Sequence, residues 1–171
     1  TYAKCGALEE AREVFKQLHV HDVVCWSALI SGYAQNGFGN EALECFRHMR
    51  DSGVCPNAVT YICVLKACGE LGAIEQGKEI HENIRCKGLL KNDVVLGTAL
   101  VDMYAKCGEL AKARDVLDNL PTHNVVSWNV LITGYAQQGQ VEEAFICFGL
   151  MQEEGICPDT ITFLCLLYAC S

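Results

Sequence analysis

The chain carries the pentapeptide YAKCG at residues 2–6 and again at residues 104–108. The same spacing relates GYAQ at residues 32–35 to GYAQ at residues 134–137. Residues 1–69 align with residues 103–171 without a gap, and 34 of these 69 pairs are identical. Identity at half of the positions over such a length indicates an internal duplication. The first expectation for the fold is therefore an array of repeats with a long period of 102 residues.

Within one 102-residue unit, the hydrophobic pattern predicts pairs of helices. Apolar residues follow the i, i+3, i+4, i+7, i+8 spacing of one helix face at Trp26, Leu29, Ile30, Tyr33 and Ala34. A second apolar helix face from Ala42 to Met49 is ended by Gly53 and Pro56. The period of two residues that is typical of a half-buried strand does not occur. Because a single helix pair cannot bury its apolar face, the sequence predicts an all-α fold, an α-solenoid of antiparallel helix pairs.

Equivalent positions divide residues 1–171 into one continuous array of helix-turn-helix repeats with unequal lengths of 35, 36 and 31 residues. Gly32 and Gly134 fall inside expected first helices, where glycine costs about 1 kcal/mol of helix propensity. We therefore expect close helix packing at both. The chain starts at Thr1 without an initiator Met, and we expect it to belong to a longer protein. The expected repeats are 1–22 (partial), 23–57, 58–93, 94–124, 125–159 and 160–171 (a first helix only).

This cycle of lengths resembles the pentatricopeptide repeat (PPR) proteins of plant organelles, and in particular their PLS subclass of alternating P, L and S repeats. The resemblance rests on DVVCW at 22–26 with ALISGY at 28–33 (P-type), VLKAC at 64–68 with GKEIH at 77–81 (L-type), and TALVDMYAKCG at 98–108 (S-type). Tetratricopeptide repeats, which bind peptides, keep a uniform period of 34 residues and fit less well. By this resemblance 23–57 and 125–159 are P-type, 58–93 is L-type and 94–124 is S-type, while 1–22 is a partial S-type and 160–171 a partial L-type repeat.

The resemblance implies a right-handed solenoid that reads single-stranded RNA, one base per repeat, through two or three side chains. In the family, the fifth and the last residue of a repeat face the base edge, and the second residue packs against the base. The implied base-reading pairs are Ser27 with Asn57, Thr98 with Asn124 and Asn129 with Asp159, and the weaker L-type pair is Ile62 with Asp93. The implied base-stacking residues are Val24, Val59, Val95 and Val126, and Lys106 is the implied phosphate contact.

The residue types in these pairs suit base recognition. An Asn amide donates and accepts hydrogen bonds and can give a proton to adenine N1, whereas an ionised Asp only accepts and suits the N3–H of uracil. By the family's code, residues 23–159 are expected to read 5′-A-n-A-U-3′, with the array parallel to the RNA. Without the resemblance, polar residues at a helix start are ordinary N-caps, Asn and Asp between helices are ordinary turn residues, and the valines are plain core.

The net charge of −8 is unusual for a nucleic-acid binder, because Lys and Arg normally supply phosphate contacts. The expected first helices nevertheless carry Lys4, Lys66 and Lys106 against Glu70 and Asp102, so most of the acidity falls on the second helices. In this family the first helices line the concave RNA groove. We therefore expect a nearly neutral groove, an acidic outer face and weak RNA binding by this stretch of chain.

The cysteines and histidines carry no signature of a metal or catalytic site. Ten of the twelve cysteines fall in pairs separated by 102 residues and no C-x-x-C occurs, so we expect reduced thiols that pack in the core. His81 is expected to be a packing or capping residue. The H-x-E and P-C-x-x-C elements of cytidine deaminases are absent, and so are phosphate-binding and nucleophile motifs. The sequence thus predicts no enzyme, no metal and no cofactor; a deaminase would require residues beyond Ser171.

The preferred interpretation is a sequence-specific RNA-binding array that positions an organellar transcript for C-to-U editing or other processing, in a mitochondrion or a chloroplast. Its expected partners are single-stranded RNA and editing-factor proteins, with no membrane and no small-molecule substrate. The alternative is a protein-interaction or structural solenoid within an organellar ribonucleoprotein, whose groove holds a polypeptide.

Overall fold

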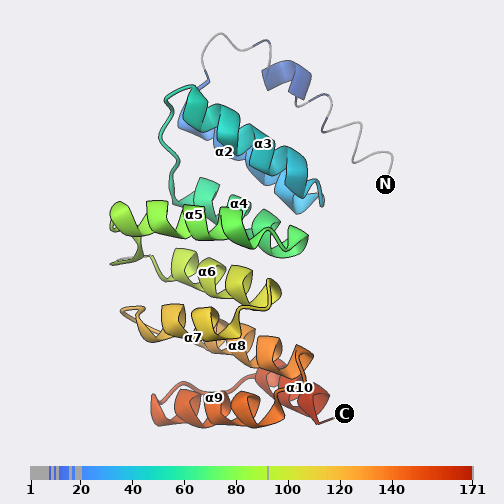
Figure 1. Cartoon of the computed structure of the whole chain (residues 1–171), viewed down its shortest axis with the longest axis vertical. Helices are drawn as coiled ribbons and strands as arrows, with labels where there is room; N and C mark the ends of the chain where they lie inside the picture. The colour runs from blue at the N-terminus through green and yellow to red at the C-terminus, as the bar shows by residue number, and fades with distance from the viewer. Residues whose placement is uncertain are drawn as a thin grey trace.

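The computed structural model describes residues 8, 10, 12–15, 17, 21–91 and 93–170. Most of the partial repeat expected at 1–22, including the first YAKCG with Lys4 and Cys5, and also His19, lies outside these residues. All regular elements in the described part of the chain are helices, which confirms the predicted all-α fold (Figure 1). From residue 21 onward they are α2 (Val23–Gln35), α3 (Gly39–Asp51), α4 (Ala58–Leu71), α5 (Ile74–Cys86), the 3₁₀ helix η1 (Leu89–Lys91), α6 (Val94–Lys106), α7 (Leu110–Asp118), α8 (Val125–Gln137), α9 (Val141–Glu153) and α10 (Thr160–Ala169).

The even-numbered helices begin with a side-chain cap, and the four helices α3, α5, α7 and α9 begin without one. In each cap a side-chain oxygen accepts a hydrogen bond from the backbone N–H three residues later, which satisfies a donor at the helix start. At the other end of α4, Gly72 adopts a left-handed conformation with φ of 64° and closes the helix. The capping residues are Asp22, Asn57, Asp93, Asn124 and Asp159, with N···O distances of 2.8–2.9 Å.

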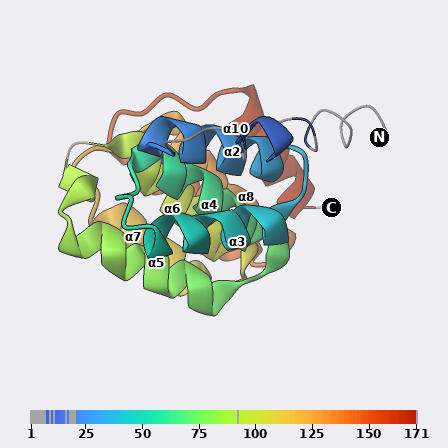
Figure 2. The same ribbon diagram turned by 90° about the horizontal axis from the view of Figure 1, so that it is seen from above.

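The helices stack in chain order along the long axis of the molecule and form two layers (Figure 1). The first-helix layer consists of α2, α4, α6, α8 and α10, each of which contacts the next. The second-helix layer consists of α3, α5, α7 and α9, each packed against its own first helix and against the first helix that follows. Seen along the stack, α3 and α5 lie on one side and α2 and α10 on the other (Figure 2). This arrangement confirms the predicted solenoid of antiparallel helix pairs.

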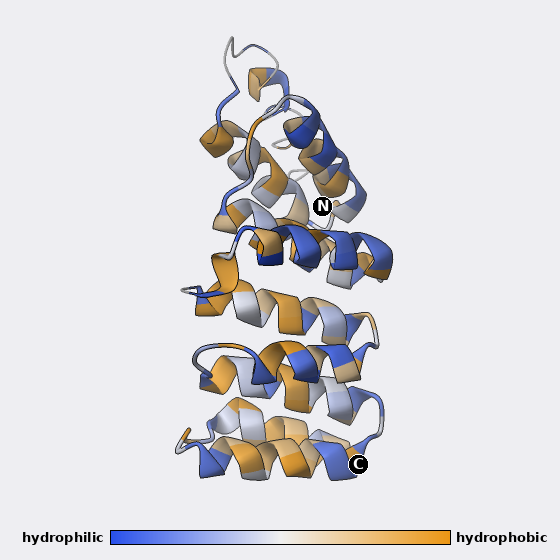
Figure 3. Cartoon of the chain, turned by 60° about the vertical axis from the view of Figure 1, so that its left-hand side comes forward, coloured by the Kyte–Doolittle hydropathy of each residue, from blue (hydrophilic) through white to orange (hydrophobic). Residues whose placement is uncertain are grey.

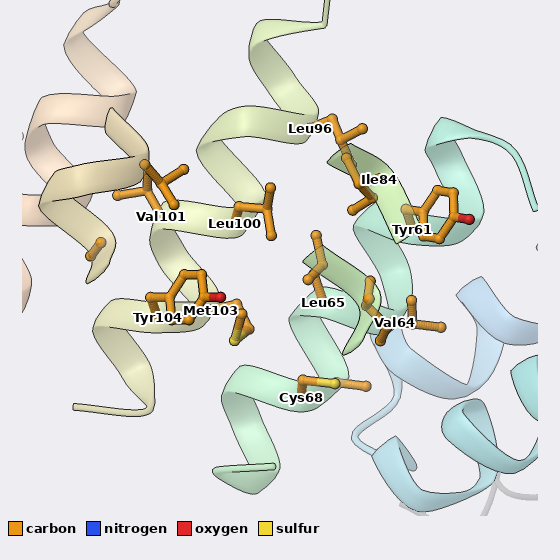
Figure 4. Close-up of a cluster of buried hydrophobic side chains, with 14 of the residues drawn as sticks. Tyr61, Val64, Leu65, Cys68, Ile84, Leu96, Leu100, Val101, Met103 and Tyr104 are labelled. Carbon is orange, nitrogen blue, oxygen red and sulfur yellow. The ribbon is translucent and has the colours of Figure 1, made fainter. Parts of the chain in front are cut away.

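The hydrophobic core lies where successive helix pairs meet. Between α4, α5 and α6, the side chains of Val64, Leu65, Cys68, Ile84 and Leu100 are fully buried and point toward one another (Figure 4). Burial of an aliphatic side chain of this size contributes about 1.5–3 kcal/mol, so each junction between repeats is a major source of stability. Because the same junction recurs along the stack, neighbouring repeats stabilise each other.

The two glycines expected at close helix contacts behave differently. A Cβ atom built on Gly134 would lie 2.7 Å from Leu110 Cδ2 and 3.1 Å from Ala105 Cβ, which is too close for an unstrained side chain. The same atom on Gly32 would lie 3.4 Å from Leu8 Cδ2, an ordinary van der Waals contact. Close packing is thus found at Gly134, whereas the contact of Gly32 within the described residues is an ordinary one; Ala3, the counterpart of Ala105, lies outside them.

The second-helix layer carries most of the exposed charge (Figure 3). Arg50 on α3 and Glu79 on α5 are joined by an ion pair of 2.6 Å that links two successive second helices. The described cysteines are unpaired, and burial raises the pKa of Cys68 to about 12 and that of Cys147 to about 11. These two thiols therefore stay protonated and pack as small apolar groups.

Candidate nucleic-acid interface

A row of aliphatic side chains is exposed at the N-terminal end of the first-helix layer. Val24, Val59, Val95 and Val126, each the second residue of its helix, are between 54% and 67% exposed. Single exposed aliphatic residues are common, but the same exposure at the same position of four successive first helices marks a surface that a ligand can cover. The interpretation of these valines as plain core is therefore wrong.

The pair Ser27 and Asn57 is joined through a third residue, Thr60. The hydroxyl of Ser27 lies 2.7 Å from Thr60 Oγ1, which in turn donates to Asn57 Oδ1 over 2.9 Å, whereas Ser27 and Asn57 themselves are 3.5 Å apart. Asn57 Oδ1 also accepts the backbone N–H of Thr60. Since a backbone N–H can only donate, this bond fixes the orientation of the amide, and its NH₂ group has no partner among the described residues.

The pair Asn129 and Asp159 is joined directly. Asn129 Nδ2 donates to Asp159 Oδ1 over 2.9 Å, and Asn129 Oδ1 accepts the hydroxyl of Thr162 over 2.6 Å. Hydrogen bonds from the backbone N–H of Thr162 and from the Asn129 amide hold the pKa of Asp159 below its ordinary value. Asp159 is therefore an ionised acceptor at neutral pH, and its Oδ2 has no partner in the described part of the chain.

The pair Thr98 and Asn124 is not joined by a hydrogen bond between the described side chains. The Thr98 hydroxyl donates to the carbonyl of Val94, one turn earlier in α6, over 2.8 Å. Asn124 caps α8, and Ser127 at the third position of α8 donates to the Asn124 backbone carbonyl over 2.9 Å. In the remaining candidate pair, Ile62 is half-buried against the core and Asp93 caps α6.

Only some of the candidate residues are therefore helix caps. Asn57, Asp93, Asn124 and Asp159 are N-caps, as the alternative interpretation expects. Ser27, Thr98 and Asn129 are not, because each is the fifth residue of its helix.

A pocket of about 290 Å³ opens between α6, α8 and α10. Val126 and the 56% exposed Ile161 lie on its lining, together with Asn129 and Asp159. The lining thus combines two aliphatic side chains with a joined polar pair, which suits a flat ring that offers apolar faces and a polar edge.

Lys106 reaches the rim of this pocket from the end of α6. Its ammonium group forms an ion pair of 2.7 Å with Asp102 on the same helix. Lys66 on α4 likewise lies 3.9 Å from Glu70. The two cations on the described first helices therefore lie beside acids, and the first-helix layer is nearly neutral.

Three residues of this surface were missed by sequence reasoning: Ile161, Thr60 and Thr162. Ile161 continues the aliphatic row into α10, and its partner at the 102-residue offset is Val59. Thr60 and Thr162 are partners at the same offset and are identical. The duplication therefore contained the signal, but nothing in a single repeat distinguishes these threonines from ordinary capping-box residues.

A larger pocket of about 550 Å³ lies on the other layer, between α5 and α7. On its lining, the His81 ring nitrogen Nδ1 lies 3.0 Å from the Tyr104 hydroxyl, and burial lowers the pKa of His81. His81 is therefore a packed, neutral residue at neutral pH. Among the residues that the structure describes, no group of His, Cys, Asp and Glu could hold a metal ion, and no helix is long and apolar enough to cross a bilayer.

Comparison with known families gives two kinds of match. The model of the PPR repeat family matches residues 21–70 and 123–171, and the model of the single PPR repeat matches residues 1–23 and 98–125.

Curated relatives from Arabidopsis thaliana match nearly the whole chain. The pentatricopeptide repeat-containing protein At4g30700 is 43% identical over 170 residues, covering 99% of this chain and 21% of its own length. A putative mitochondrial relative, At3g11460, is 41% identical with coverage of 99% and 27%. A chloroplastic relative, At1g08070, is 44% identical with coverage of 99% and 23%. The chain thus spans about a fifth to a quarter of these proteins.

Solved structures of similar fold include the pentatricopeptide repeat protein PPR10 in complex with an 18-nt psaJ RNA element. It matches with a TM-score of 0.77 and 24% identity, over 92% of this chain and 24% of PPR10. PPR10 from maize matches with a TM-score of 0.69 and 25% identity, over 86% of this chain and 22% of PPR10. Both matches show the solenoid fold.

Proposed function

Because the chain belongs to the PPR repeat family, we propose that it binds single-stranded RNA in a sequence-specific way, one base per repeat, along the capped ends of its first helices. The observation that carries this proposal is the alternation of exposed aliphatic residues with polar pairs whose hydrogen-bond polarity is fixed (Ser27–Asn57 and Asn129–Asp159). The complex of PPR10 with an RNA element supports RNA as the ligand class.

The first base fits adenine. The outward NH₂ group of Asn57 offers donors, and adenine N1 is an acceptor that carries no proton. Asn124 is oriented in the same way by the backbone N–H of Ser127, so the third base is adenine too. The half-buried Ile62 offers no hydrogen bond, and the second base is left unspecified.

The fourth base fits uracil. Asp159 Oδ2 is a free acceptor for the N3–H of uracil, and the second N–H of the Asn129 amide can donate to a uracil carbonyl. A base in the 290 Å³ pocket would lie between Val126 and Ile161, which supports their role in stacking. The proposed reading frame of residues 23–159 is therefore 5′-A-n-A-U-3′, parallel to the chain.

In its parent protein this array would position a transcript for processing in an organelle, with C-to-U editing as our preferred process and editing factors as partners. Mitochondrial and chloroplastic relatives support an organellar site. The repeat-type pattern supports the PLS subclass, and no chemistry is assigned to this stretch of chain. Since Asp102 already neutralises part of the charge of Lys106, we expect weak phosphate contact and weak binding with a shallow dependence on salt.

The test is fluorescence anisotropy of this chain with labelled oligonucleotides that carry A-n-A-U or a scrambled order, at one fixed low salt concentration. The ordered RNA should bind several-fold more tightly. Asn57→Asp replaces the donor by an acceptor and should shift the preference at the first base from A toward G by about tenfold, since a wrongly paired polar edge costs at least about 1.4 kcal/mol.

The matched control is Asn40→Asp, which adds the same charge at an exposed position in the first turn of α3. It should weaken binding to all RNAs equally. Equal binding of ordered and scrambled RNA, or no shift with Asn57→Asp, would refute base reading and favour a groove for polypeptide.

A further inference from the structure

We propose that Thr60 and Thr162 are specificity-determining positioning residues, each a buried hydroxyl that the following repeat supplies to the base-reading pair of the repeat before it. This inference rests on the proposed function and deepens it. Each P-type reading site would then consist of three side chains from two repeats: Ser27, Asn57 and Thr60 in one, and Asn129, Asp159 and Thr162 in the other.

The argument is strongest at Thr162, whose side chain is fully buried. Its hydroxyl donates to Asn129 Oδ1 over 2.6 Å, and its oxygen accepts the backbone N–H of Asp159 over 3.1 Å. The hydroxyl therefore engages the one acceptor of the Asn129 amide. The amide oxygen is thereby held toward Thr162, whose hydroxyl also lies 3.0 Å from Asp159 Oδ1. The NH₂ group of Asn129 then faces Asp159 and, in the proposed binding mode, the base, so Thr162 favours the orientation in which Asn129 acts as a donor.

At the first site, the fully buried Thr60 links two side chains that barely reach each other. Ser27 and Asn57 are 3.5 Å apart, but each lies within 2.9 Å of Thr60 Oγ1. The hydroxyl protons of Ser27 and Thr60 are then both used in hydrogen bonds within this triad. The Asn57 amide and the Ser27 oxygen are thereby presented to the base in one fixed arrangement.

The S-type site provides an internal contrast. Ser127 occupies the same third position of its helix and is equally buried, but its hydroxyl donates to the backbone carbonyl of Asn124 and not to a side chain of the pair. Thr98, the other member of that pair, bonds to Val94. A buried hydroxyl at this position is therefore not sufficient; its bond to the reading side chains carries the proposed role.

The experiment measures the ratio of affinities for RNAs that differ only at the fourth base, uracil against cytosine. Thr162→Val keeps the side-chain shape and removes the hydroxyl, so Asn129 can turn its oxygen toward the base. We expect the ratio to fall from about tenfold to about twofold. Thr162→Ser restores the hydroxyl and should keep at least half of the wild-type ratio.

Ser127→Ala is the matched control, since it removes an equally buried hydroxyl and should leave the preference at the third base unchanged. Far-UV circular dichroism checks that each variant is folded. Should Thr162→Val fail to fold, the pair Thr60→Val and Thr60→Ser decides the question at the first base, where Val must lower the preference for A over G and Ser must retain it.

The outcomes separate the two proposals. A wild-type chain without base preference refutes the proposed function. A wild-type preference that Thr162→Val retains, or that Thr162→Ser loses to the same extent as Thr162→Val, leaves RNA reading intact and overturns the role of the hydroxyl.

Discussion

Residues 23–57 and 125–159 share a fold and more than half of their residues, yet they bury the same tryptophan in different surroundings. Trp128 donates from Nε1 to Glu154 Oε2 over 3.0 Å. Trp26, its counterpart 102 residues earlier, is also buried, and its Nε1 has no hydrogen-bond partner in the described part of the chain. The residue in the place of Glu154 is Ser52. The same backbone fold thus accommodates a buried indole N–H with a hydrogen-bond acceptor and one without.

The neighbours of the two tryptophans explain how both arrangements persist. His123 contacts Glu154 at 2.8 Å, and Arg114 lies 5.4 Å from the Trp128 ring centroid, so this copy is polar. In the first copy, Phe15 stacks on His21 at 4.0 Å and meets Trp26 edge-on at 4.6 Å. Aromatic pairs contribute about 0.5–1.5 kcal/mol beyond area, which offsets part of the missing hydrogen bond.

The largest predicted effect comes from Glu154→Ser, which gives the second copy the residue of the first. Trp128 Nε1 and His123 lose their partner without gaining an aromatic neighbour, so the free energy of unfolding should fall by about 2 kcal/mol. Urea denaturation followed by far-UV circular dichroism measures it. Glu153→Ser, at the adjacent exposed position, should change stability by less than about 0.5 kcal/mol.

The loss of stability in Glu154→Ser should also depend on pH. Partial burial would raise the pKa of Glu154, but hydrogen bonds from His123 and Trp128 outweigh it and hold the pKa below its ordinary value. The ionised Glu154 carboxylate therefore contributes fully to the free energy of unfolding above about pH 4.3, the pKa of an unfolded Glu. This contribution is lost as the pH falls through the lower pKa of the folded state. A deficit of Glu154→Ser that stays constant down to pH 3 would contradict a role of the ionised carboxylate.

The paired glycines give the second prediction, in which the two copies should respond with opposite sign. Gly134→Ala forces a methyl group against Leu110 and Ala105 and should lower stability by about 1 kcal/mol, even after the gain in helix propensity. Among the described residues, Gly32→Ala meets only an ordinary contact with Leu8, and it should raise stability by up to about 1 kcal/mol. Thermal denaturation of the two variants side by side checks this, and equal signs would mean that the copies pack alike.

The smallest predicted effect is the reciprocal change, Ser52→Glu, which offers Trp26 the acceptor that Trp128 has. The new hydrogen bond should raise the free energy of unfolding by about 0.5–1 kcal/mol, since a carboxylate at a helix C-terminus is unfavourable and offsets part of the gain. Trp fluorescence during urea denaturation reports it. If Ser52→Glu destabilises the chain, the aromatic cluster of the first copy leaves no room for the polar arrangement.

Most of the fold could be predicted from the sequence because its determinants are local. The starts of α2, α4, α6, α8 and α10 follow from acidic or amide caps placed immediately before apolar helical patterns. The length of α10 was overestimated, because its pattern runs to the end of the chain whereas the helix ends at Ala169.

The candidate site could be predicted only in part. Helical periodicity cannot tell an exposed Val126 from a buried one, so the aliphatic row came from the resemblance alone. Whether Thr98 bonds to Asn124 or to its own helix depends on one side-chain rotamer, which no sequence pattern encodes. The bond from Thr162 to Asn129 spans 33 residues, and the unsatisfied Trp26 depends on what lies opposite it in space.

The hydroxyl of Thr162 belongs to one helix pair and serves the side chains of the pair before it. A module exchanged by recombination or by protein engineering at the helix start, between Asp159 and Thr160, would separate Asn129 and Asp159 from the hydroxyl that binds them. A joint in the turn between α8 and α9 would instead separate Asn129 from both Asp159 and Thr162. A transferable unit that keeps this triad must therefore extend from the start of α8 into the first turn of α10 and is longer than one repeat.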